Sequence, residues 1–205
     1  MILEYAFETP LLDSADSANY SVNGTVTYPA GKVGNCVSIP GTGGSPGAGD
    51  YPYVAEPASF AFGTGAFMYS FWLNDTVLGH NEPILMDDLA SNEFYMWTNH
   101  NNPPYTGQIT VGDSGVIWYT SLANTWQYIE IGRTGTGSGQ GFMTINRGAP
   151  ITFTVSTSFS NGTLFFGESP NHYYHWAGMI DQFRVWSRVL TTDERDYVYN
   201  SGTGR

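Results

Sequence analysis

Lysine is almost absent from this chain of 205 residues, where Lys32 is the only example. Lys and Arg together number 7 against 18 Asp and Glu, which gives a formal net charge of −11. A surface with this balance repels phosphate backbones, so we expect no nucleic-acid partner. The excess of carboxylates suits either a soluble, self-repelling surface or cation binding by clustered acids.

Cysteine and long apolar runs are also scarce. Cys36 is the only cysteine, which excludes an internal disulfide framework and predicts a small, buried apolar side chain. No apolar run approaches the roughly 20 residues of a membrane span, so we expect no membrane partner. The first residues, MILEYAFETPLLDS, lack the features of a signal peptide. If they are the natural start, they predict synthesis in a cytosol without export by the general secretory route.

What the chain has in quantity is glycine, at 25 residues, and aromatic residues, at 16%. Short runs rich in β-branched and aromatic residues alternate with Gly, Asn, Asp and Pro. Examples are FMYSFWLND (67–75), EFYMWTN (93–99), WQYIEIGR (126–133) and GTLFFGES (162–169). This pattern predicts an all-β fold, with a single domain over residues 1–205 built as an antiparallel sandwich.

Two of these runs allow finer predictions. In WQYIEIGR, the partial alternation of Trp126 and Tyr128 indicates one buried face, which Ile129 interrupts. In INRGAP, residues 146–148 predict a hairpin turn. The tryptophans on strand-like runs are expected in the core, and they are Trp72, Trp126 and Trp186.

One short helix is predicted near the end of the chain. Thr191 and Glu194 have the spacing of a capping box, with Thr191 as the N-cap. The helix would run to about Asn200, and Gly202 stands where a left-handed C-terminal cap belongs. We expect Leu190 and Val198 to face the sheet, and Arg195 and Asp196 to stay in water.

The segment GMIDQFRVWSRVLTTDERDYVYNSG (178–202) resembles the closing segment of the laminin-G-like, concanavalin A-like jelly rolls, including the pentraxins. Further resemblances follow in the same order as in that family. They lie in LEYAFETPLLDSADS (3–17), AGKVGNCVSIPG (30–41) and YVAEPASFAFGTGAFMYSFWLN (53–74). The resemblance thus covers nearly the whole chain. It implies an antiparallel jelly-roll β-sandwich with one short C-terminal helix.

The family that this sequence resembles includes enzymes, but the residue patterns of their active sites are missing here. Glucanases of this fold carry Glu-x-Asp-x-x-Glu on one strand, because alternate residues then point into the same groove. No such spacing occurs in this sequence. Polysaccharide lyases of the fold present a cationic face, which a chain with one lysine does not favour. We therefore expect no catalytic residues and no enzyme activity, and a polysaccharide-degrading enzyme is the weakest alternative.

Many members of the family that this sequence resembles bind glycans. Sugar recognition needs aromatic rings for the C–H faces and polar groups for the hydroxyls. Two stretches offer that mixture, residues 94–107 and 167–176. Their candidate ligand-binding residues are Trp97, Asn99, His100, Asn101, Asn102, Tyr105, Glu168, Asn171, His172, Tyr173 and Tyr174. The alternative is that Trp97 and Tyr105 merely pack a long loop.

One structural calcium is the only cofactor that the sequence suggests, and none is strictly required. Asp13 and Asp16 lie in a turn near the start, and Asp181 lies on the last strand. First and last strands are often neighbours in these sandwiches, so the three carboxylates are candidate metal ligands. Alternatively, Asp13 only forms an Asx turn.

The leading hypothesis is a non-catalytic module that binds a glycan or protein surface. A lectin-like fold without an export signal favours a virion surface protein, such as a phage capsid decoration or tail component. Its partners would be capsid or tail proteins, and it would form a defined homo-oligomer. The alternative is a secreted or cell-surface lectin domain of a larger, extracellular protein.

Overall fold

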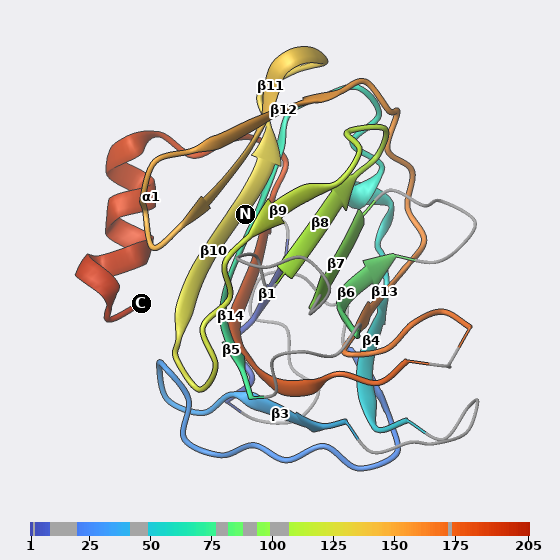
Figure 1. Ribbon diagram of the computed structural model, residues 1–205, viewed down its shortest axis with the longest axis vertical. Helices are drawn as coiled ribbons and strands as arrows, with labels where there is room; N and C mark the ends of the chain where they lie inside the picture. The colour runs from blue at the N-terminus through green and yellow to red at the C-terminus, as the bar shows by residue number, and fades with distance from the viewer. Residues whose placement is uncertain are drawn as a thin grey trace.

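The computed structural model describes residues 1, 3–8, 20–41, 49–76, 82–87, 94–98, 107–171 and 174–205. Within these ranges the chain forms two antiparallel sheets that pack face to face, with helix α1 outside one of them (Figure 1). The expected antiparallel sandwich with a short C-terminal helix is confirmed. No helix in the described ranges has the length and apolarity to cross a lipid bilayer.

The first sheet has the strand order β1-β14-β5-β10-β11-β12, and β3 also pairs with β14. Its strands are β1 (Leu3–Tyr5), β3 (Val37–Pro40), β5 (Phe67–Asp75), β10 (Gln127–Arg133), β11 (Gly137–Ile145), β12 (Ile151–Val155) and β14 (Ala177–Trp186). The first and last strands, β1 and β14, are direct neighbours, as expected.

The second sheet has the order β2-β4-β13-β6-β7-β8-β9. Its strands are β2 (Ser21–Asn23), β4 (Tyr51–Ala55), β6 (Pro83–Asp87), β7 (Phe94–Thr98), β8 (Gly107–Val111), β9 (Ile117–Tyr119) and β13 (Thr163–Phe166). The helical elements are η1 (Ala58–Phe60), α1 (Thr192–Tyr199) and η2 (Asn200–Gly202).

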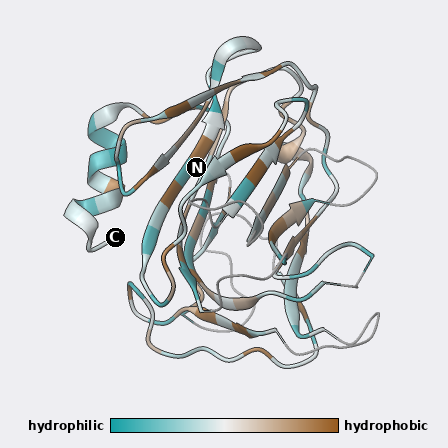
Figure 2. Cartoon of the chain, viewed as in Figure 1, coloured by the Kyte–Doolittle hydropathy of each residue, from teal (hydrophilic) through white to brown (hydrophobic). Residues whose placement is uncertain are grey.

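The core lies between the two sheets. Phe71 and Ile131 enter it from the first sheet, and Ile109 and Phe166 enter it from the second. All four side chains are fully buried. Figure 2 shows brown, apolar positions recurring along the strands. Each such side chain stabilises the sandwich by roughly 1.5–3 kcal/mol through the area it removes from water.

The outer face of the first sheet is covered as well, which corrects one expectation about β10. Ile129 belongs to the core between the sheets, whereas Tyr128 lies on the outer side. There Tyr128 contacts Trp72 and Tyr199, with ring centroids 5.1 and 5.3 Å apart. The strand is therefore buried on both faces, and Ile129 does not interrupt a pattern. Trp126, expected in the core, is only half-buried.

Local signals near the C-terminus predicted the helix correctly, except for its C-cap. Thr191 Oγ1 accepts the N–H of Glu194 at 3.4 Å, and the Glu194 carboxylate accepts the N–H of Thr191 at 2.8 Å. This confirms the capping box. The left-handed C-cap is Asn200, with φ of 50°, rather than Gly202. Asn tolerates this conformation because its short polar side chain bonds locally, here to the Gly204 carbonyl at 3.0 Å.

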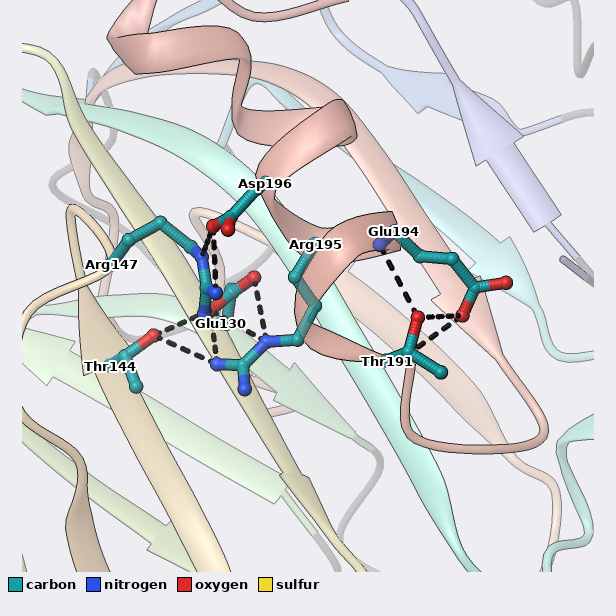
Figure 3. A network of polar contacts seen from close by, with 7 residues as sticks. All are labelled: Glu130, Thr144, Arg147, Thr191, Glu194, Arg195 and Asp196. Carbon is teal, nitrogen blue, oxygen red and sulfur yellow. Dashed lines mark hydrogen bonds and ion pairs between the residues drawn. The ribbon is translucent and has the colours of Figure 1, made fainter.

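Helix α1 is fixed to the first sheet by a buried carboxylate. Glu130 accepts from Arg195 Nε at 3.1 Å, Arg147 Nη1 at 3.1 Å and Thr144 Oγ1 at 2.6 Å (Figure 3). The expectation that Arg195 stays in water is therefore wrong, because a charge buried on the sheet draws it inward. Asp196 is mostly exposed but bonds Arg147 at 2.8 Å.

Apolar contacts complete the attachment of the helix. Leu190 packs with Met68, Phe142 and Trp186, and Val198 lies against this cluster. Both expected sheet-facing residues of the C-terminal segment are thus confirmed. The turn predicted over residues 146–148 lies between β11 and β12 as expected. Residues 146 and 147 have φ of 51° and 60°, and the N–H of Gly148 donates to the carbonyl of Ile145 at 2.9 Å.

Candidate functional site

The two sequence stretches proposed for binding meet in the structure. Trp97, at the end of β7, contacts Tyr174, in the connection between β13 and β14, with ring centroids 5.6 Å apart at an interplanar angle of 69°. Trp97 is half-buried and Tyr174 is 44% exposed. The predicted ligand residues Asn99, His100, Asn101, Asn102, Tyr105, His172 and Tyr173 lie outside the described residues.

The β13–β14 connection is organised around a buried carboxylate–imidazole pair. Glu168 Oε2 lies 2.5 Å from His175 Nδ1, and the Glu168 side chain is fully buried. Ser169 bonds Glu168 through its N–H at 3.0 Å and Asn171 through its hydroxyl at 2.6 Å. Ser169 Oγ also accepts the N–H of Tyr174 at 3.2 Å, which ties Tyr174 to the same group. Glu168, Asn171 and His175, all from the predicted stretch 167–176, are therefore linked through Glu168 and Ser169.

Gly49 packs closely against the same pair. A Cβ at this position would lie 2.2 Å from Glu168 Oε2 and 2.4 Å from His175 Nδ1. No other residue fits there without displacing the pair. His175 Nε2 is buried and has no hydrogen-bond partner among the described residues.

Beside this connection, the outer face of the second sheet carries several aromatic rings. Most of them were not singled out in the sequence analysis. Directly opposite residues of antiparallel strands point to the same face of a sheet. Phe165 is opposite both Tyr53 and Met86, and Met86 is opposite Tyr95. One row of the sheet therefore carries Tyr53, Phe165 and Tyr95 away from the core.

A second row runs alongside, two residues further on. Trp97 is opposite Gln108, and Gln108 is opposite Trp118. On β4, Tyr51 lies next to Phe165, with ring centroids 6.0 Å apart. We define the aromatic face as this whole set: Tyr51, Tyr53, Tyr95, Trp97, Trp118, Phe165 and Tyr174. The sequence held a signal for it, since YPY and YMW place rings at alternate positions.

Two tyrosines of the aromatic face carry neutral hydroxyls. Burial, and then the charge of Asp87, raises the pKa of Tyr95 to about 12. Burial, and then Glu168, raises the pKa of Tyr51 above its ordinary value of 10. Both phenols therefore stay protonated at physiological pH and can donate and accept hydrogen bonds. The face combines flat apolar rings with neutral polar groups.

The predicted calcium ligands are only partly within the described residues. Asp13 and Asp16 lie outside them, and Asp181 lies on β14. Asp181 Oδ2 accepts the N–H of Val33 at 2.8 Å, whereas Oδ1 is buried without a partner among the described residues. Burial raises the pKa of Asp181 to about 7. The described residues contain no group of three or more His, Cys, Asp or Glu able to hold a metal ion.

Comparison with solved structures shows the fold in other proteins. Domain 4 of AbnA, a GH43 extracellular arabinanase from Geobacillus stearothermophilus in complex with arabinotriose, has a TM-score of 0.72 at 14% identity. The match covers 100% of this chain and 98% of that one. The binding domain of Paraclostridial Mosquitocidal Protein 1 has a TM-score of 0.73 at 17% identity, covering 98% and 51% of the two chains.

Botulinum neurotoxin type C, whose cell entry depends on interaction with two ganglioside molecules, has a TM-score of 0.74 at 14% identity. That match covers 98% of this chain and 50% of the toxin chain, so this chain spans about half the length of either toxin structure. No curated protein matches the sequence. The family model of the Concanavalin A-like lectin/glucanases superfamily, Laminin_G_3, matches residues 46–194. With most of its length matched, the chain belongs to the Concanavalin A-like lectin/glucanases superfamily.

Proposed function

We propose that this chain is a non-catalytic carbohydrate-binding module whose ligand lies on the aromatic face. The observation that carries the proposal is the gathering of half-buried rings from β4, β13, β7 and β9 on one face, next to the exposed ring of Tyr174. Such rings stack on the C–H faces of sugars, while phenol and amide groups bond their hydroxyls. The arabinotriose and ganglioside partners of two structural neighbours support it by analogy.

The carboxylates beside the aromatic face favour binding over catalysis. Asp87 and Glu168 are both buried. Asp87 Oδ2 accepts the N–H of Phe94 at 2.8 Å, and Glu168 is held by His175. Glycoside hydrolysis needs two carboxyl groups that flank the bound sugar, with one of them activating water or attacking it directly. Groups already held inside the protein are poorly placed for that role.

The expectation of a virion surface stays a prediction. A decoration or tail protein should co-purify with particles and form a defined homo-oligomer, whereas an extracellular lectin domain should bind sugar while free. The toxin and arabinanase neighbours support the extracellular alternative by analogy. Size-exclusion chromatography of the isolated chain and of particle fractions separates the two settings.

A single calcium at Asp181 also stays a prediction. Oδ1, buried and without a hydrogen-bond partner in the part of the chain that the structure describes, suits a hard cation, which prefers carboxylate and carbonyl oxygens. Asp181, Asp13 and Asp16 would hold the ion and fasten the first strand to the last. The expected result is a higher melting temperature with added Ca²⁺, abolished in Asp181→Asn. An unchanged melting temperature in the wild-type chain would contradict the calcium prediction.

The proposed function is tested by a glycan array on the isolated chain, with Ca²⁺ and again with chelator. We expect specific hits under both conditions, because the aromatic face needs no metal. Hits lost with chelator would place the ligand on a metal instead of the rings. An array without any hit would contradict the proposal and favour a protein surface as the partner.

A further inference from the structure

The basic residues of this chain are distributed unevenly along its length. No Lys or Arg occurs between Lys32 and Arg133, or between Arg147 and Arg184. Those two gaps contain β4, β6, β7, β8, β9 and β13, which is all of the second sheet except β2. The β2 strand, Ser21–Asn23, has no basic residue either. The second sheet and the connections within these gaps thus carry no permanent positive charge.

The seven basic side chains instead lie on or against the first sheet and its covering helix. Lys32 lies 4.6 Å from the ring centroid of Trp72 on β5. Arg133 is fully buried and donates to backbone carbonyls, with Nε 2.8 Å from the oxygen of Gly65. Arg147 and Arg195 hold Glu130 on β10, as described above. The remaining three are Arg184 on β14, Arg188 beside helix α1 and Arg205 over Tyr197.

The aromatic face, in contrast, is bordered by acids. Asp87 Oδ2 accepts the N–H of Phe94, next to Tyr95, at 2.8 Å, and Glu168 bonds His175, next to Tyr174. Both buried carboxylates therefore lie beside residues of the aromatic face. Anionic ligands are bound in proteins chiefly through Arg and Lys. A carboxylate, sulfate or phosphate brought to this face would meet these carboxylates and find no Lys or Arg on the second sheet.

The rings also extend further than one sugar. Tyr53 and Tyr95 belong to strands separated by two others, β13 and β6. Neighbouring strands lie about 4.8 Å apart, so the two rings are spread over about 14 Å. Trp118 lies two strands beyond β7, which adds about 10 Å. A ligand that contacts all of them has to be a chain that crosses the strands.

We infer that the aromatic face takes a neutral, extended oligosaccharide, laid across the strands from β4 toward β9, and rejects sialylated, sulfated and uronic-acid glycans. This inference rests on the proposed function and adds ligand class and binding mode to it. It also predicts a ligand class different from that of botulinum neurotoxin type C, because gangliosides carry acidic sugars. Specificity arises from an unfavourable electrostatic term against anions as much as from ring stacking.

The test is isothermal titration calorimetry of the full chain with neutral oligosaccharides of two and six units (xylan, arabinan and β-glucan series). The anionic probes are sialyllactose, a galacturonic acid hexamer and a heparin hexamer. We expect a neutral hexamer to bind at least about tenfold more tightly than its dimer, because it reaches more rings. The affinity should not change between about 50 and 500 mM NaCl, since no ion pair forms.

Four variants test where the ligand lies. Tyr53→Ala and Trp97→Ala each remove a ring and should weaken hexamer binding by about tenfold. Tyr197→Ala is the matched control, because this ring is 63% exposed on α1, outside the first sheet, and its loss should change nothing. Thr110→Lys, opposite Tyr95, should create measurable affinity for the anionic hexamers. This gain of binding requires a folded protein, so it guards against variants that merely unfold.

The possible failures are distinguishable. Tighter binding of an anionic probe than of any neutral one would overturn the inference while leaving a carbohydrate-binding function intact. Equal affinity for dimer and hexamer, or a hexamer unaffected by both ring deletions, would do the same. A chain that binds none of these probes and none on a broad array would contradict the proposed function itself.

Discussion

Replacing Glu130 by alanine is expected to loosen helix α1 from the first sheet. The Glu130 side chain is fully buried and accepts from Thr144, Arg147 and Arg195. Removing one partner of a buried ion pair typically costs about 3–5 kcal/mol, because the remaining charges lose their compensation. The two arginine side chains here keep 15% and 16% exposure, so water can reach them. We therefore expect a loss near the lower end, about 3 kcal/mol.

Urea unfolding followed by tryptophan fluorescence measures this loss, and a fall in melting temperature of about 6–12 °C should accompany it. Glu130→Gln keeps the shape and an acceptor, so its cost should be about half as large. The control is Arg188→Ala, which breaks the exposed pair between Arg188 and Glu194, with side chains 55% and 42% exposed. That change should cost far less, because exposed pairs are weak.

A double-mutant cycle between positions 130 and 195 completes the test. If the buried carboxylate is what anchors the helix, the double variant Glu130→Ala, Arg195→Ala should be less destabilised than the sum of the single variants. The reasoning is refuted if Glu130→Ala costs no more than Arg188→Ala, or if the two sites prove additive. In that case the apolar cluster around Leu190 holds the helix alone.

Three further predictions concern other residues. Because burial raises the pKa of Asp181 to about 7, the folded state keeps a proton that the unfolded state has already released. In chelator, stability should thus fall by up to about 4 kcal/mol as the pH rises from about 4 to 7, and Asp181→Asn should flatten that slope in urea titrations. Burial raises the pKa of Cys36 to about 12, so the thiol should react with Ellman's reagent only after unfolding; rapid reaction of the native chain would contradict this. Thr191→Ala should cost about 1 kcal/mol by removing the N-cap, whereas an unchanged unfolding midpoint would show that the cap is dispensable.

Much of the fold could be predicted because its signals are local. The capping box at Thr191 and Glu194 lies within four residues, and the hairpin at Asn146 needs only two left-handed residues. The strand runs between turn residues likewise indicate a sandwich without knowledge of which strands pair. Where a local signal was ambiguous, as at the end of the helix, the boundary shifted from Gly202 to Asn200.

Only part of the candidate site could be predicted, because the signals in a sequence are local. Trp97 and Tyr174 were singled out from composition, but only the fold shows that their rings touch. Tyr53, Phe165 and Tyr95 were missed because they come from three segments far apart in the sequence. Alternation tells which residues of one strand share a face. It does not tell which strand is the neighbour.

Composition and near neighbours along the chain were enough to predict the strand runs, the sandwich class and the shortage of positive charge. Contacts between distant residues, in contrast, place β4, β13, β6 and β7 side by side and turn Arg195 inward to Glu130. Both outcomes depend on long-range pairing and on the cost of leaving a buried charge uncompensated. The aromatic face exists because that pairing places rings from distant strands in one row.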